Sequence, residues 1–165
     1  MSAPIGHLAS RRGLLRWAAL GLAVLAPACA AAEPVREFVM HRDPGCGCCH
    51  AWMAHIEQTG RFQTSMRDEQ NMPALKRRLR VPSDLVSCHT EEVAGFVIEG
   101  HVPAQDIMRL LRVRPRGIIG LSVPGMPLGS PGMEQVGSAA REAFDVFAFR
   151  ADGAREAFAR YDART

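Results

Sequence analysis

The spacing of hydrophobic residues after residue 34 predicts strands and helices in alternation. Apolar and polar side chains alternate loosely over residues 35–41, which predicts a first strand. Asp43-Pro44-Gly45 has the composition of a turn. From about Cys46 the apolar side chains recur at helical spacing, and Gly60 ends this predicted helix. The residues on its apolar face are Cys49, Trp52, Met53 and Ile56.

The following segments continue the alternation. Residues 62–67 predict a second strand and residues 72–79 a second helix. Residues 86–102 predict two short strands, and the apolar spacing after Pro103 predicts a third helix that ends near Arg112. Strand, helix, strand, helix, two strands and a helix is the order of a thioredoxin-like domain. We therefore expect an α/β fold, in which helices flank a mixed sheet.

The C-terminal part has two further features. Residues 144–149 and 155–161 read as a hairpin around Asp152-Gly153, which would extend or cap the sheet. Before it, residues 122–137 are rich in glycine and proline and predict a long loop. We expect one domain over residues 33–165, because the chain is long enough for one modest core.

The first 32 residues have the organisation of an export signal. Three arginines precede an apolar stretch over residues 17–25, and small residues follow it. This stretch is shorter than the about 20 apolar residues that a membrane-spanning helix needs, so we expect cleavage and no stable membrane insertion afterwards. Arg11-Arg12 resembles a twin-arginine signal, and an ordinary basic start is the alternative. We therefore expect an exported protein.

Charge and motifs exclude several classes of function. The formal charge of +3 arises in the export signal, which holds three of the 20 basic residues and none of the 17 acidic ones. The rest of the chain is formally neutral and lacks the basic surface that nucleic-acid binding requires. The sequence also lacks G-x-S-x-G, H-E-x-x-H and phosphate-binding glycine motifs. We therefore expect neither a nucleic-acid-binding protein nor a hydrolase.

Cysteine content points to metal or redox chemistry. Four of the five cysteines lie outside the export signal: Cys46, Cys48, Cys49 and Cys88. In an oxidising compartment such cysteines are paired, metal-bound or actively kept reduced. Two structural disulfides are therefore one possible arrangement.

The motif Cys46-Gly47-Cys48-Cys49 allows two functional interpretations. Cys46 and Cys49 form a C-x-x-C at a predicted helix N-terminus, where the thiolate is stabilised, as in a thiol-disulfide oxidoreductase. Cys48 is not needed for that exchange, and three thiolates within four residues favour a soft metal such as Cu(I), with zinc as the second choice. Further candidate ligands are Cys88, His89, His101, Met126 and Met133, and thioether ligation favours copper over zinc.

Four motifs in one order give the chain a resemblance to a known family. They are Pro44-Gly45-Cys46-Gly47-Cys48-Cys49, Ser87-Cys88-His89-Thr90, the segment from Gly95 to Pro103, and the glycine-rich segment from Gly120 to Glu134. Together they resemble the CopG-like family, long catalogued as a domain of unknown function. The resemblance covers nearly all of residues 35–161.

This resemblance implies both a fold and a function. It implies a thioredoxin-like domain in the bacterial periplasm that is associated with copper resistance. Our own hypothesis is that the protein acts in copper homeostasis or resistance by binding Cu(I), which the same thiolates could cycle with Cu(II). We expect copper ions, and other periplasmic copper-handling proteins, as partners. The implied metal ligands are Cys46, Cys48, Cys49, Cys88, Met126 and Met133, with His101 and His89 as weaker additions.

Overall fold

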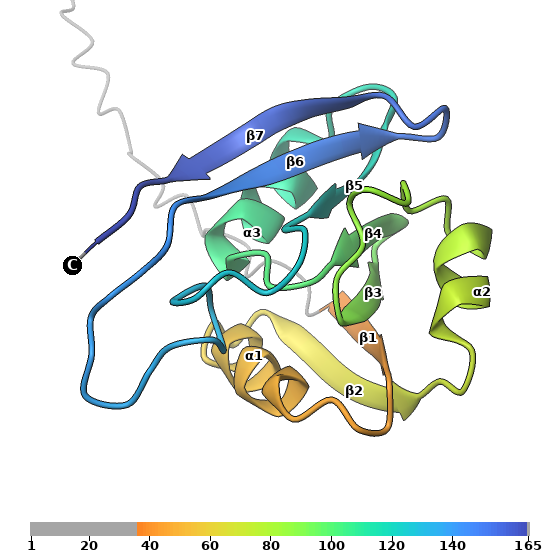
Figure 1. Cartoon of the computed structure of the whole chain (residues 1–165). Coiled ribbons are helices and arrows are strands. Elements are labelled where there is room, and N and C mark those ends of the chain that lie inside the picture. Colours follow the sequence, from red (N-terminus) through yellow and green to blue (C-terminus); the bar gives the residue numbers. More distant parts are fainter. Residues whose placement is uncertain (1–35, 165) are drawn as a thin grey trace, which may run out of the picture. The chain divides into compact units, whose positions relative to one another are not determined.

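In the computed structural model, which describes residues 36–164, seven strands form one mixed sheet (Figure 1). The strand order across the sheet is β2-β1-β3-β4-β5-β6-β7. The strands are β1 (Arg36–Arg42), β2 (Phe62–Asp68), β3 (His89–Val93), β4 (Phe96–Glu99), β5 (Ile118–Ser122), β6 (Phe144–Arg150) and β7 (Arg155–Tyr161). The helices are α1 (Cys48–Glu57), α2 (Met72–Arg78) and α3 (Ala104–Val113). The predicted export signal lies outside the described residues.

The first four strands confirm the predicted order of elements. β1 and β2 run parallel and are connected through α1, while β3 is antiparallel to both β1 and β4. A parallel strand-helix-strand unit beside an antiparallel hairpin is the arrangement expected of a thioredoxin-like domain. The α/β class with a mixed sheet and flanking helices is therefore confirmed.

The sheet continues beyond these four strands. β5 is parallel to β4, and β6 and β7 add an antiparallel hairpin, as the sequence predicted for the C-terminal segment. β5 itself was not predicted. It begins directly after the Pro115 and Gly117 that end α3, and its uninterrupted apolar run is typical of a strand buried on both faces.

Helices cover both faces of the sheet. α1 and α3 pack on one face over the main core, while α2 lies on the opposite face (Figure 1). Side chains of β4 show this division, because Phe96 and Ile98 join the main core and Val97 joins the smaller one. The predicted apolar face of α1 is confirmed, since all four of its apolar side chains are buried. No helix among residues 36–164 has the length and hydropathy of a membrane span.

Two anchors fix the start of α1 against the rest of the domain. The indole Nε1 of Trp52 donates to the Val102 carbonyl at 3.1 Å. On its other side, Gly132 lies so close to Trp52 that an added Cβ would come within 2.6 Å of the Trp52 backbone nitrogen. Gly132 also has a positive φ of +80°, which other residues rarely adopt. The long glycine-rich loop is therefore held against α1 at the end that carries the cysteines.

Candidate metal centre

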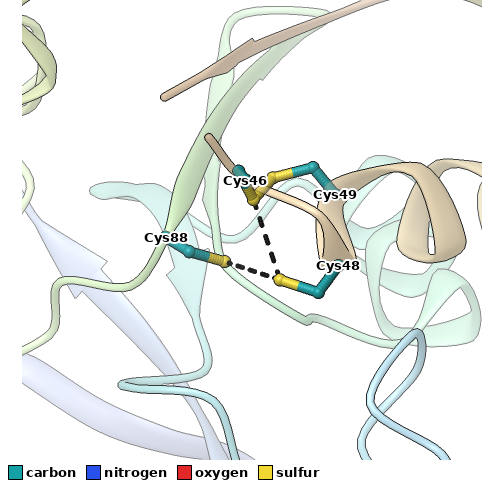
Figure 2. Close-up of side chains that lie close together, drawn as sticks. All are labelled: Cys46, Cys48, Cys49 and Cys88. Atoms are coloured by element: carbon teal, nitrogen blue, oxygen red, sulfur yellow. Dashed lines mark hydrogen bonds between the residues drawn. A yellow bond between two sulfur atoms is a disulfide. The ribbon is translucent and has the colours of Figure 1, made fainter. Parts of the chain in front are cut away.

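Four cysteine side chains converge where β1 leads into α1 (Figure 2). The turn at residues 43–46 reverses the chain after β1, with the Cys46 backbone N–H donating to the Asp43 carbonyl at 2.9 Å. Cys48 then opens α1, and Cys88 directly precedes β3, which is hydrogen-bonded to β1. The Sγ atom of Cys48 is 3.7 Å from that of Cys46 and 3.7 Å from that of Cys88. All four sulfur atoms lie within 4.8 Å of one another.

Cys46 and Cys49 are joined by a disulfide, with their Cα atoms 5.7 Å apart, whereas Cys48 and Cys88 are free thiols. The structure therefore contains one disulfide among the four cysteines, and not the two considered from the sequence. The three-residue separation at the start of a helix brings the Cα atoms of Cys46 and Cys49 within disulfide range. Cys49 is buried, and the other three cysteines are half-buried at the surface.

Two buried histidines adjoin the cysteines. Nδ1 of His89 is 2.9 Å from Cys88 Sγ and 3.4 Å from Cys49 Sγ. Nε2 of His101 is 3.2 Å from Cys88 Sγ. The other ring nitrogen of His101, Nδ1, is 2.8 Å from the carbonyl oxygen of Pro131, which can only accept a hydrogen bond. Nε2 of His101 therefore presents its lone pair to Cys88, as a metal-binding imidazole does.

The structure thus brings together six of the eight predicted ligands. The two methionines both lie in the loop that adjoins the site. Met126 is 53% exposed and follows Gly125, whose N–H donates to the Val86 carbonyl at 3.1 Å. Met133 is half-buried, with its backbone N–H donating to the Ser130 carbonyl at 2.8 Å. Metal ligation by any of the eight residues stays a prediction, as does the approach of the two thioethers to the thiols.

Burial keeps Cys88, His89 and His101 uncharged in the metal-free protein. Burial, and then the neighbouring Cys48 thiol, raise the pKa of Cys88 to about 12. Burial lowers the pKa of His101, and burial together with the nearby His101 and Lys76 lowers the pKa of His89 to well below its usual value. The imidazoles are therefore neutral and able to coordinate, while a metal that binds Cys88 must displace its proton.

A buried ion pair supports the segment that carries Cys88. Lys76 of α2 donates to Glu99 Oε1 at 2.5 Å and to the Thr90 hydroxyl at 2.8 Å. Glu99 also accepts the backbone N–H of Ser87 at 2.6 Å. Sequence reasoning missed this pair. Its only signal is a charged residue that ends the otherwise apolar run of β4.

A second buried carboxyl lies on the other face of β3. Glu91 is fully buried in the main core, and its Oε1 is 3.4 Å from Nε2 of His89. Burial, and then the Glu99 carboxyl, raise the pKa of Glu91 well above its usual value. This residue was not predicted either, although the two-residue periodicity of a strand places it on the same face as His89 and Val93.

Comparisons with known proteins place the chain in a family. A family model described as "Protein of unknown function, DUF411" matches residues 85–133. A solved structure of "Copper resistance protein copG- Form 1" is 40% identical, with a TM-score of 0.71, and the match covers 79% of this chain and 99% of that one. The corresponding Form 2 structure is 39% identical, with a TM-score of 0.70, over 77% and 98% of the two chains. No curated protein matches. The chain therefore belongs to the CopG-like, DUF411 family.

Proposed function

We propose that this protein binds copper as Cu(I) through a thiolate site and acts in copper homeostasis or resistance. One observation carries the proposal: four cysteine sulfurs from two distant segments lie within 4.8 Å of one another. Thiolates are soft ligands, and they select Cu(I) over harder cations. The name of the similar solved structures, copper resistance protein, supports copper as the ion.

The donor set fits copper best in the reduced protein. The disulfide withholds two sulfurs, Cys46 and Cys49, until two electrons and two protons convert it to thiols. Cys48, Cys88 and Nε2 of His101 remain available in either state. We propose that reduction completes the thiolate site and that Met126 and Met133 supply thioether ligands from the adjoining loop. Cycling between Cu(I) and Cu(II) at these ligands is part of the same proposal.

The proposed location is the periplasm, with residues 1–32 as a cleaved export signal. Supporting this are the basic, apolar and small-residue zones in the sequence of that segment. Other periplasmic copper-handling proteins are the proposed partners. Sequencing the N-terminus of protein recovered from the periplasm tests this point, and an intact N-terminus would contradict it.

The test of copper binding is the copper and zinc content per chain after anaerobic loading of reduced protein. We expect copper in the wild type and its loss in Cys46→Ser/Cys49→Ser. For the thioethers, Met126→Leu and Met133→Leu should each weaken Cu(I) binding. Met66→Leu is their matched control, because Met66 is a similarly exposed methionine on β2, 40% accessible. Reduced wild-type protein that takes up no copper would refute the proposal.

A second candidate function is thiol-disulfide exchange, favoured by the disulfide at the start of α1. In this alternative, Cys46 attacks a substrate disulfide and Cys49 resolves the mixed disulfide. Cys48→Ser separates the two functions, because exchange does not require Cys48 whereas the copper site does. We expect this variant to retain any exchange activity and to bind copper more weakly. Unchanged copper affinity in Cys48→Ser would contradict the proposed copper site.

A further inference from the structure

One buried pair of side chains holds most of the buried polar atoms that lack a hydrogen bond in the described part of the chain. Four buried side-chain nitrogen or oxygen atoms lack a hydrogen bond there: Arg42 Nε, His89 Nε2, Glu91 Oε1 and Glu91 Oε2. Three of the four belong to His89 and Glu91. Because nearly all buried polar groups in proteins are hydrogen-bonded, such a concentration requires a physical explanation.

The strand geometry places these two residues side by side. His89 and Glu91 are two positions apart on β3, so both side chains point to the core face of the sheet. The His89 ring packs against the rings of Trp52 and His101, with centroids 4.9 Å away in each case. Glu91 Oε1 lies 3.4 Å from His89 Nε2, just beyond a good hydrogen bond. A hydrogen bond between these two atoms would satisfy one atom of each residue.

The opposite edge of the same ring faces the thiols. Nδ1 of His89 lies 2.9 Å from Cys88 Sγ and 3.4 Å from Cys49 Sγ. The orientation of the ring therefore decides whether a nitrogen or a carbon is presented to the sulfur cluster. Glu91 is the polar partner that its Nε2 edge faces.

We propose that Glu91 is a positioning residue that holds the His89 ring in one orientation and one tautomer, with Nδ1 directed at the thiols of Cys88 and Cys49. A carboxyl oxygen that accepts a hydrogen bond from the far nitrogen of a histidine is a common means of orienting a metal ligand. The consequence for copper rests on the proposed function. The orientation of the ring is a property of the metal-free protein.

The change in stability on replacing Glu91 separates a positioning role from a purely structural one. Glu91 Oε2 has no hydrogen-bond partner. Burial of such an oxygen costs free energy, and an apolar side chain of similar size removes that cost. Glu91→Met should therefore raise the urea midpoint of the metal-free protein while it releases the ring. A structural carboxyl would lower the midpoint when replaced and leave the ring unchanged.

The test is ¹⁵N NMR of the histidine ring nitrogens in reduced, metal-free, full-length protein. We expect His89 in wild type to show the shifts of a single tautomer. Glu91→Gln retains a polar group that can bond to Nε2 and should retain this pattern, whereas Glu91→Met should give shifts averaged between tautomers. Glu92→Met is the matched control, because Glu92 is the exposed neighbour on the opposite face of β3. Averaged shifts in wild type, or unchanged shifts in Glu91→Met, would overturn the proposal.

Cu(I) affinity, measured by competition with a chromogenic chelator, gives the second readout. Loss of such an orienting contact typically weakens metal binding about 10- to 100-fold, which we expect for Glu91→Met but not for Glu91→Gln or Glu92→Met. Wild type that binds no copper would refute the proposed function while the NMR result still decides the role of Glu91. Copper binding with an unchanged His89 spectrum in Glu91→Met would refute the role of Glu91 alone.

Discussion

Removal of Lys76 should destabilise the fold strongly, because its partner Glu99 is fully buried. The Lys76 side chain is 10% exposed and that of Glu99 is 0% exposed, and their charged atoms are 2.5 Å apart. Lys76→Met leaves the Glu99 carboxyl without its counter-charge in the interior. Removing one partner of a buried pair typically costs about 3–5 kcal/mol in free energy of unfolding. Glu99 keeps hydrogen bonds from Ser87 and Thr90, so we expect about 3 kcal/mol, at the low end of that range.

The assay is urea unfolding of the reduced, metal-free protein. Arg77→Met is the matched control, because Arg77 is the exposed neighbour of Lys76 on α2. Lys76→Met/Glu99→Gln should be more stable than Lys76→Met, since the second change removes the unpaired buried charge. Equal stability of Lys76→Met and Arg77→Met would refute this reasoning, as would a double variant no more stable than the single one.

Two further predictions concern Gly132, in the loop that packs against α1, and Tyr161 of β7, which is bonded to Asp106 of α3. Gly132→Ala should lower the free energy of unfolding by about 1–3 kcal/mol, because its Cβ would overlap the backbone of Trp52. Gly137→Ala, at a similar positive φ but in open space, should cost less, and equal losses in urea unfolding would contradict the overlap. Burial and a hydrogen bond to Asp106 raise the pKa of Tyr161 from 10.0 to about 12. Its contribution to stability should thus be complete below pH 10 and disappear as the pH rises through about 12, and alkaline unfolding curves should lose this component in Tyr161→Phe.

The order of strands and helices was largely predictable because each amphipathic element buries one face. Apolar spacing located α1 and α3, and turn residues separated β3 from β4 and β6 from β7. β5 was missed because its five residues carry no polar alternation and lie between proline and glycine positions typical of loops. Its place in the interior of the sheet depends on pairing with β4 and β6, which no local pattern encodes.

The candidate site was predictable in its residue types but not in its contacts. The cysteine motif indicated soft-metal or redox chemistry, and the cysteine count added Cys88, which lies 40 residues from Cys48 in the sequence. The pairing of Cys46 with Cys49, rather than two disulfides, depends on distances that the sequence leaves open. The buried partners Lys76, Glu99 and Glu91 were missed because charged side chains are ordinarily predicted to face solvent.

X-ray absorption at the copper edge of reduced, Cu(I)-loaded protein tests the thiolate site most directly. The account predicts a sulfur-dominated shell around copper in wild type, fewer sulfur neighbours in Cys88→Ser, and no change in Met66→Leu. Copper surrounded only by nitrogen or oxygen, or an identical sulfur shell in Cys88→Ser, would contradict it.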